Sequence, residues 1–178
     1  VEPHNALALR LRYEEDGRPV PHYYPNLPDG FQMLELLDQQ IRQLQPKTVI
    51  LCSEVFALLG MTPARSAVAR LAHLLAGYDV TIYCHLRRVD EYLSSWHRQR
   101  LKFRTPISRL AEDGMQRYLG TAHVEQAQMI EGWIADRFPK ARLVIRNFDE
   151  VRRGGGSIHD FIAHSGADFP PGLVIPAD

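Results

Sequence analysis

The sequence has few cysteines and no long apolar run. Only two of its 178 residues are cysteine, and no apolar stretch is long enough to span a bilayer. No segment has the pattern of a signal peptide. Because Cys52 and Cys84 both lie inside apolar, strand-like runs, we expect two reduced core thiols rather than a disulfide. Together these absences favour a cytoplasmic protein.

Metal-ligand spacings and an excess of one charge are also missing. Neither C-x-x-C nor H-E-x-x-H occurs and the eight histidines are scattered, so the sequence gives no support to a metal site. Lys+Arg and Asp+Glu are equal at 21 each, which leaves no global basic field to attract nucleic acid or anionic membrane. Locally the balance differs, because residues 87–104 hold six arginines and lysines against only Asp90 and Glu91.

Three short apolar segments indicate strands of a parallel sheet. Apolar content of 45% and charged content of 24% are ordinary for a globular protein, and we expect residues 1–178 to form a single α/β domain. The segments are β-branched and almost continuously apolar, as in strands that are covered on both faces. They are Lys47–Ser53, Asp79–Leu86 and Arg142–Phe148.

Helical patterns lie between these strands. Apolar residues recur at helical spacing over 31–44, 64–76 and 124–138, and Ser157 with Asp160 has the spacing of a capping box at the start of a last helix. Residues 4–12 have the composition of a helix end, and residues 13–30, with four prolines, predict an irregular loop. The alternation predicts a three-layer α/β fold with ligands at the carboxyl ends of its parallel strands. Three strands are few for so many helices, so we expect the fold to be incomplete at its N-terminus.

The strand-to-helix turn after residue 86 carries the clearest functional pattern. The strand ends at Arg87 and Arg88, and a helix opens at Asp90 with Ser94 and Ser95 in its first turns. Arginine forks, hydroxyls and unpaired backbone N–H groups at a helix start are suited to a phosphate or sulfate group. The turn therefore predicts an anion-binding site.

The same residues resemble a known family. LRRVDEYLSS, residues 86–95, is similar to the 3′-phosphate-binding segment of PAPS-dependent sulfotransferases, in which a strand-end arginine and a serine eight positions later hold the 3′-phosphate. Arg87 and Ser95 match these two positions. Looser similarity to the bacterial branch extends over residues 47–168, through VILCSEVFALL, RLVIRNFDEV and SIHDFIAHSGAD.

The resemblance implies a fold and a reaction. The fold would be the P-loop-NTPase-like sulfotransferase fold, and the reaction would move the sulfuryl group of PAPS to a hydroxyl of a carbohydrate or glycolipid, with PAPS as co-substrate and no metal. A Gly-Thr-rich loop of the type K-x-G-T-T/S, which holds the 5′-phosphosulfate in that family, does not occur in this sequence. A fragment of an enzyme and a descendant that no longer catalyses are both compatible with that difference.

Each candidate site residue also has a purely structural interpretation. Arg87 would either bind phosphate or pair with Asp90 or Glu91 at the helix start, and Ser95 depends on that choice. Glu54 would be the general base, with Ser53 orienting it, at the position where the resemblance places acceptor chemistry. Alternatively, Ser53 is the N-cap of a helix over 55–59 and Glu54 lies in its first turn.

Neighbouring side chains have simpler predicted roles. Arg88 should point away from Arg87 and form a surface ion pair, because side chains alternate along a strand. His85 shares a strand face with Tyr83 and Arg87, and we expect it to be a hydrogen-bonded core residue. Aromatic residues that recur at helical spacing are expected in the core, namely Tyr92, Trp96 and Phe103.

Two further function classes remain open from the sequence. One is a non-catalytic sulfotransferase-like module that binds a nucleotide or a partner protein, which the missing loop favours. The other is nucleic-acid binding through the basic helix over residues 90–104, which the neutral net charge disfavours.

Overall fold

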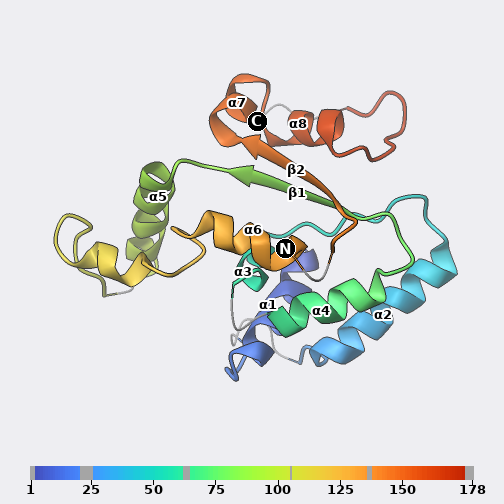
Figure 1. The fold of residues 1–178 in the computed structure, drawn as a ribbon, viewed down its shortest axis with the longest axis horizontal. Coiled ribbons are helices and arrows are strands. Elements are labelled where there is room, and N and C mark those ends of the chain that lie inside the picture. Colours follow the sequence, from blue (N-terminus) through green and yellow to red (C-terminus); the bar gives the residue numbers. More distant parts are fainter. Residues whose placement is uncertain (1–2, 21–25, 62–64, 105, 136–137, 175–178) are drawn as a thin grey trace. The chain divides into compact units, whose positions relative to one another are not determined.

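The computed structural model describes residues 3–20, 26–61, 65–104, 106–135 and 138–174 (Figure 1). The chain divides into two compact units, residues 1–80 with 127–141 and residues 81–126 with 142–178. The single domain expected over residues 1–178 stays a prediction. Among the described residues, no helix combines the length and apolarity needed to cross a membrane.

The first unit is helical and is built around α1 (Pro3–Glu15). Leu7, Ala8 and Leu11 of α1 are buried, and the helix contacts three others. These are α2 (Gly30–Leu44), α3 (Val55–Leu59) and α4 (Arg65–Leu74) (Figure 1). The helix that we expected at residues 4–12 is therefore present and forms the core of this unit.

The predicted helix over residues 31–44 is confirmed as α2, and local chemistry sets its ends. The Asp29 side chain accepts from the backbone N–H of Gln32 while the Gln32 side chain accepts from that of Asp29, a complete capping box. At the other end Gln45 adopts a left-handed conformation, and Pro46 follows. Phe31 and Leu44, which we placed on the packed face, are exposed.

The strand predicted over Lys47–Ser53 is wrong. Residues 47–53 form no strand, and the side chain of Val49 is 41% exposed. An extended segment becomes a strand only when a neighbour accepts and donates its backbone hydrogen bonds, and no described residue pairs with this segment as a strand. Instead, the Cys52 N–H donates to Nδ1 of His4. Cys52 is consequently an exposed thiol, not the core residue that we expected, and it is unpaired like Cys84.

A helix of the 127–141 segment packs closely against α3. The helix α6 (Gln126–Ile134) is shorter than the predicted range 124–138. Gly132 lies against the carbonyl of Gly60, so closely that a Cβ at residue 132 would stand 1.6 Å from that oxygen. Nearby, the Trp133 indole N–H donates to the carbonyl of Phe56 at 3.2 Å. The absence of side chains at the two glycines is what allows this approach.

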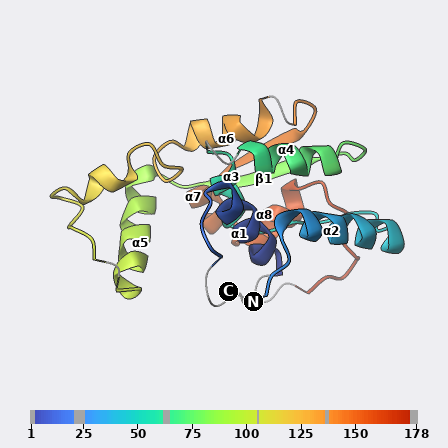
Figure 2. The same cartoon turned by 90° about the horizontal axis from the view of Figure 1, so that it is seen from below.

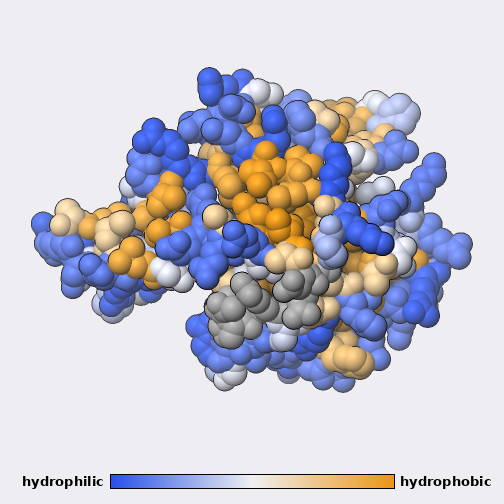
Figure 3. Space-filling view, in the orientation of Figure 1, coloured by the Kyte–Doolittle hydropathy of each residue, from blue (hydrophilic) through white to orange (hydrophobic). Residues whose placement is uncertain are grey.

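The second unit contains a parallel two-stranded sheet. β1 (Thr81–Leu86) and β2 (Arg142–Asn147) pair in register from Thr81 opposite Arg142 to Leu86 opposite Asn147. The α/β class with a parallel sheet is thus confirmed. Because side chains alternate, one face carries Tyr83, His85 and Arg146, and the other carries Ile82, Cys84, Leu86, Leu143 and Ile145. Figure 3 shows apolar surface in the area of the strands, where Ile145 is exposed.

The remaining elements of this unit follow the strand ends. α5 (Val89–Lys102) follows β1, and η1 (Gly114–Tyr118) comes next in the chain. α7 (Phe148–Arg153) follows β2, where the Asn147 side chain accepts from the N–H of Asp149 and begins the helix. α8 (Ser157–His164) then lies on the sheet face of Tyr83, with Phe161 edge-on to the Tyr83 ring.

Aromatic rings join α5 to the segment after it, which returns beside the helix (Figure 2). The His123 ring stacks against both Tyr92 and Trp96, and Nδ1 of His97 lies 3.2 Å from the Tyr118 hydroxyl. Tyr92 and Trp96 therefore pack against another ring, although they are half-buried and not in the core as expected. Phe103 does not, because it is 71% exposed at the end of α5, beyond the reach of this cluster.

Candidate anion-binding site

Arg87 stands at the carboxyl end of β1 and is held by two other elements. Its Nε donates to Oε2 of Glu91 in α5 at 3.2 Å, and its guanidinium lies over the Phe148 ring, 5.4 Å from the ring centroid. The carbonyl of Arg87 accepts from Nε2 of Gln126 at 3.0 Å. The ion pair between Arg87 and Glu91, one of the two expected in the structural interpretation, is therefore formed. It fixes the direction of the guanidinium.

The pairing leaves one edge of the guanidinium open. Among the described residues, the two Nη groups of Arg87 have no hydrogen-bond partner, and the side chain is 28% exposed. Two parallel N–H groups on one edge match two oxygens of a phosphate or sulfate. Arg88 is different, because its guanidinium is fully engaged with the Asp90 carboxylate in the exposed pair that the sequence predicted.

Ser95 lies on the face of α5 to which Arg87 is tied. Glu91 and Ser95 are four residues apart in the helix, so they are neighbours on one face, and Arg87 is paired with Glu91. Ser94, by contrast, donates its hydroxyl to the carbonyl of Asp90. No side chain caps the start of α5, so its first backbone N–H groups contribute positive charge there. A hollow of about 700 Å³ borders the other side of α5, at Val89 and Leu93, and Arg87 does not line it.

Ser53 and Glu54 belong to the first unit, so the structure gives them no geometry relative to Arg87. The Ser53 hydroxyl is hydrogen-bonded to Oδ1 of Asn5 and accepts from the N–H of Val55 at 3.1 Å. Ser53 is nevertheless not the N-cap that the structural interpretation expected, because Glu54 holds that position and lies outside the first turn of α3. Glu54 is exposed at the N-cap of α3 and makes no capping hydrogen bond. Its carboxylate is accessible, and its role as a general base stays a prediction.

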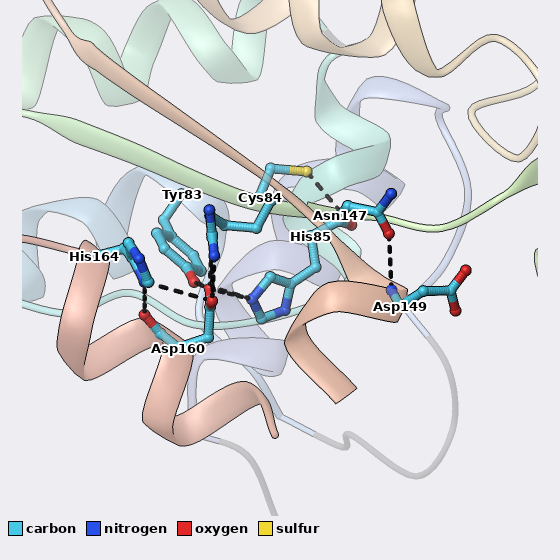
Figure 4. A network of polar contacts seen from close by, with 8 residues as sticks. Tyr83, Cys84, His85, Asn147, Asp149, Asp160 and His164 are labelled. Carbon is cyan, nitrogen blue, oxygen red and sulfur yellow. Dashed lines mark hydrogen bonds and ion pairs between the residues drawn. The ribbon is translucent and has the colours of Figure 1, made fainter. Parts of the chain in front are cut away.

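A carboxylate network that the sequence did not reveal lies on the α8 side of the sheet (Figure 4). Asp160, 8% exposed, accepts three hydrogen bonds from Arg146, the shortest at 2.8 Å from Nη2. It also accepts from the Tyr83 hydroxyl. His85 Nε2 is 3.0 Å from that hydroxyl and 3.5 Å from Oδ2 of Asp160, and His164 Nδ1 is 3.4 Å from Oδ1.

The capping box expected from Ser157 and Asp160 is not formed. Gly156 is the N-cap of α8 and no side chain caps it, because the Asp160 carboxylate turns to the sheet. The alternation of side chains along the strands could have indicated this network from the sequence. A carboxylate that faces Arg146 and two histidines is stabilised more by ion pairing than by a position at a helix start. Arg142 reinforces the same contact by donating to the carbonyl of Ser165, just after α8.

Opposite pKa shifts describe the charge state of this network. The hydrogen bonds from Arg146 hold the pKa of Asp160 well below its ordinary value, so the carboxylate is ionised. Burial, and then the hydrogen bond to the Asp160 carboxylate, raise the pKa of Tyr83 well above its ordinary value. Tyr83 is therefore a neutral donor to Asp160 across the physiological range.

Among the described residues, no group of three or more histidine, cysteine or acidic side chains is arranged to hold a metal ion. Comparison of the chain with protein-family models, with curated proteins and with solved structures gives no match.

Proposed function

We propose that this chain is a PAPS-dependent sulfotransferase, or a large part of one, that acts on a hydroxyl of a carbohydrate or glycolipid. The observation that carries the proposal is the open Nη edge of Arg87, whose guanidinium is held by Glu91 and Phe148. In the proposed complex Arg87 and Ser95 hold the 3′-phosphate of the cofactor. The proposed fold is the three-layer P-loop-like fold of that family, and the parallel pairing of β1 with β2 supports it.

The reaction is an in-line displacement at sulfur. The acceptor oxygen forms a bond to sulfur as the bond from sulfur to the 5′-phosphate oxygen breaks, and adenosine 3′,5′-bisphosphate leaves. The acceptor's proton passes to a general base, for which we propose Glu54, oriented by Ser53. Arg87 acts by holding the bisphosphate in position, and two hydrogen bonds from a charged group contribute about 1.5–3 kcal/mol each.

A second candidate is a nucleotide-binding module without catalysis. It is favoured by the absence of any K-x-G-T-T/S segment in the sequence, since that segment would hold the 5′-phosphosulfate. Such a module would use the same Arg87 site, and only turnover would separate it from the enzyme.

Calorimetric titration with adenosine 3′,5′-bisphosphate tests the proposal, with 5′-AMP as the matched ligand that lacks the 3′-phosphate. We expect saturable binding of the bisphosphate and at least tenfold weaker binding of 5′-AMP. Equal affinities would contradict a 3′-phosphate site. Binding of a labelled oligonucleotide with a steep salt dependence would instead support nucleic-acid recognition through residues 90–104.

A further inference from the structure

His85 and Arg87 are neighbours at the end of β1. His85 lies in β1 (Thr81–Leu86), and Arg87 follows directly after the last residue of that strand. Both also contact one ring, because the His85 ring centroid is 6.5 Å from that of Phe148 and the Arg87 guanidinium lies over it. The His85 side chain is 21% exposed. An anion held on the open edge of Arg87 would therefore lie in the vicinity of the imidazole.

The hydrogen bonds around His85 use only one of its nitrogens. The Tyr83 hydroxyl donates to Asp160, so at 3.0 Å it accepts from Nε2–H of His85. Nδ1 has no hydrogen-bond partner among the described residues. The structure thus fixes the Nε2–H form and leaves Nδ1 to take up a proton.

The charges facing His85 do not supply a carboxylate of its own. Asp160 of α8 lies 3.5 Å from Nε2 of His85, and Tyr83, Arg146 and His164 all contact that carboxylate. From α7, whose Phe148 ring lies beside His85, Glu150 adds a negative charge that acts on Arg146. Asp160 is already neutralised by the two-pronged contact from Arg146. Arg87 in turn is paired with Glu91. An imidazolium at residue 85 consequently lacks an unshared counter-charge unless an anion binds beside it.

We infer that His85 is a second anion-binding side chain of the Arg87 site and that it binds phosphate or sulfate as the imidazolium. This inference rests on the anion site of the proposed function and adds its dependence on protons. Binding of the anion takes one proton from solvent onto Nδ1, and release of the anion returns it. The site is accordingly stronger in mildly acidic solution, where the imidazole is protonated more readily.

Inorganic sulfate is the direct probe, because its charge does not change over the range in which histidine titrates. We expect the affinity of the chain for sulfate to fall about fivefold to tenfold from about pH 6 to about pH 8. Calorimetric titrations in PIPES and in bis-tris, two buffers with different heats of ionisation, measure this proton uptake at a pH near the ordinary histidine pKa. The difference between the two binding heats should correspond to the uptake of up to one proton.

Two histidine variants test whether His85 is the group that takes up this proton. His85→Asn should keep the affinity found at about pH 8 and lose the increase at lower pH. His164→Asn removes the other histidine near Asp160, which is 43% exposed and on α8, and should leave the pH dependence unchanged. In the wild-type chain, the NMR signals of the His85 ring should shift when sulfate is added at about pH 6, which needs no variant.

The outcomes separate this inference from the proposed function. Sulfate or bisphosphate binding with no proton uptake, or a pH dependence that survives His85→Asn or is lost in His164→Asn, overturns the role of His85 alone. No binding of sulfate or of the bisphosphate at about pH 6 overturns both the inference and the Arg87 site.

Discussion

The guanidinium of Arg87 is held on two sides and open on the third. Glu91 takes Nε and the Phe148 ring supports the plane, which leaves the Nη edge for a ligand. A long side chain that is already ordered loses less entropy when a ligand binds, so the ion pair favours anion binding as well as the helix start. The structural and the functional interpretation of Arg87 are therefore compatible.

The role of Glu54 is tested at the same scale by one substitution. Glu54→Gln keeps the shape of the side chain and removes its basicity, so sulfuryl transfer from PAPS should fall at least a hundredfold. The affinity for adenosine 3′,5′-bisphosphate, measured by calorimetry, should change less than twofold. If turnover is retained, Glu54 has only a role at the start of α3.

Asp160 provides a prediction about stability and pH. Its pKa is depressed in the folded chain, chiefly by Arg146, so the carboxylate stabilises the fold above its unfolded pKa, close to the ordinary 3.8. That contribution is lost as the pH falls through the lower folded pKa. Asp160→Asn should therefore lower the melting temperature by several degrees at neutral pH and by less in strong acid.

The control for this prediction is Asp149→Asn. Asp149 lies in the first turn of α7 of the same unit, and its N–H, rather than its carboxylate, makes the helix-start hydrogen bond. Thermal melts of the two variants should differ most near neutral pH. Equal losses at every pH would show that the charge of Asp160 is unimportant.

At the scale of elements, the contact of α3 with α6 depends on two glycines. A Cβ at residue 132 would stand 1.6 Å from the carbonyl oxygen of Gly60, and backbone atoms cannot move aside as a flexible side chain does. Gly132→Ala should lower the free energy of unfolding by about 2–3 kcal/mol. Gly77→Ala is the control, since nothing lies within 4 Å of a Cβ there. Denaturant titration of both variants decides the point, and equal stabilities would contradict this packing.

The stack of His123 on Tyr92 and Trp96 makes the attachment of α5 sensitive to pH. Burial, and then the charge of Arg100, lower the pKa of His123 below the ordinary 6.5. The unfolded chain therefore binds more protons than the folded chain at mildly acidic pH. The contribution of His123 to the free energy of unfolding is complete above the ordinary pKa of 6.5 and declines as the pH falls toward the folded pKa. His123→Phe keeps a stacking ring without a titrating group. Urea titrations should show a smaller acid decline in this variant than in the wild type, and an identical decline would exclude His123 as its source.

Local patterns in the sequence predicted elements where one segment decides its own structure. The helix α2 follows from its apolar spacing, and β1 with the helix after it follows from one apolar run that ends at arginines. The strand prediction for residues 47–53 was wrong because a strand needs a pairing partner, and the segment itself does not specify one. Asp160 was misassigned for the same reason, since its partners are Tyr83 and Arg146 on the sheet.

At the scale of the whole molecule, the balanced charge makes any anion recognition local. Lys+Arg and Asp+Glu are equal, so no long-range field attracts a phosphate, and the proposed recognition depends on a few side chains near the end of β1. Nothing in the composition indicates which acceptor would be used. The sequence therefore predicted the anion site more specifically than the fold around it, because the site follows from one strand-to-helix turn.

The most direct measurement of the central claim combines a ligand change with a residue change. Adenosine 3′,5′-bisphosphate and 5′-AMP are each titrated into the wild-type chain and into Arg87→Ala, with Arg88→Ala as the control. The account predicts that Arg87→Ala weakens the bisphosphate about tenfold to a hundredfold and leaves 5′-AMP almost unchanged, while Arg88→Ala affects neither. Equal losses for both ligands, or no loss in a folded Arg87→Ala chain, would contradict it.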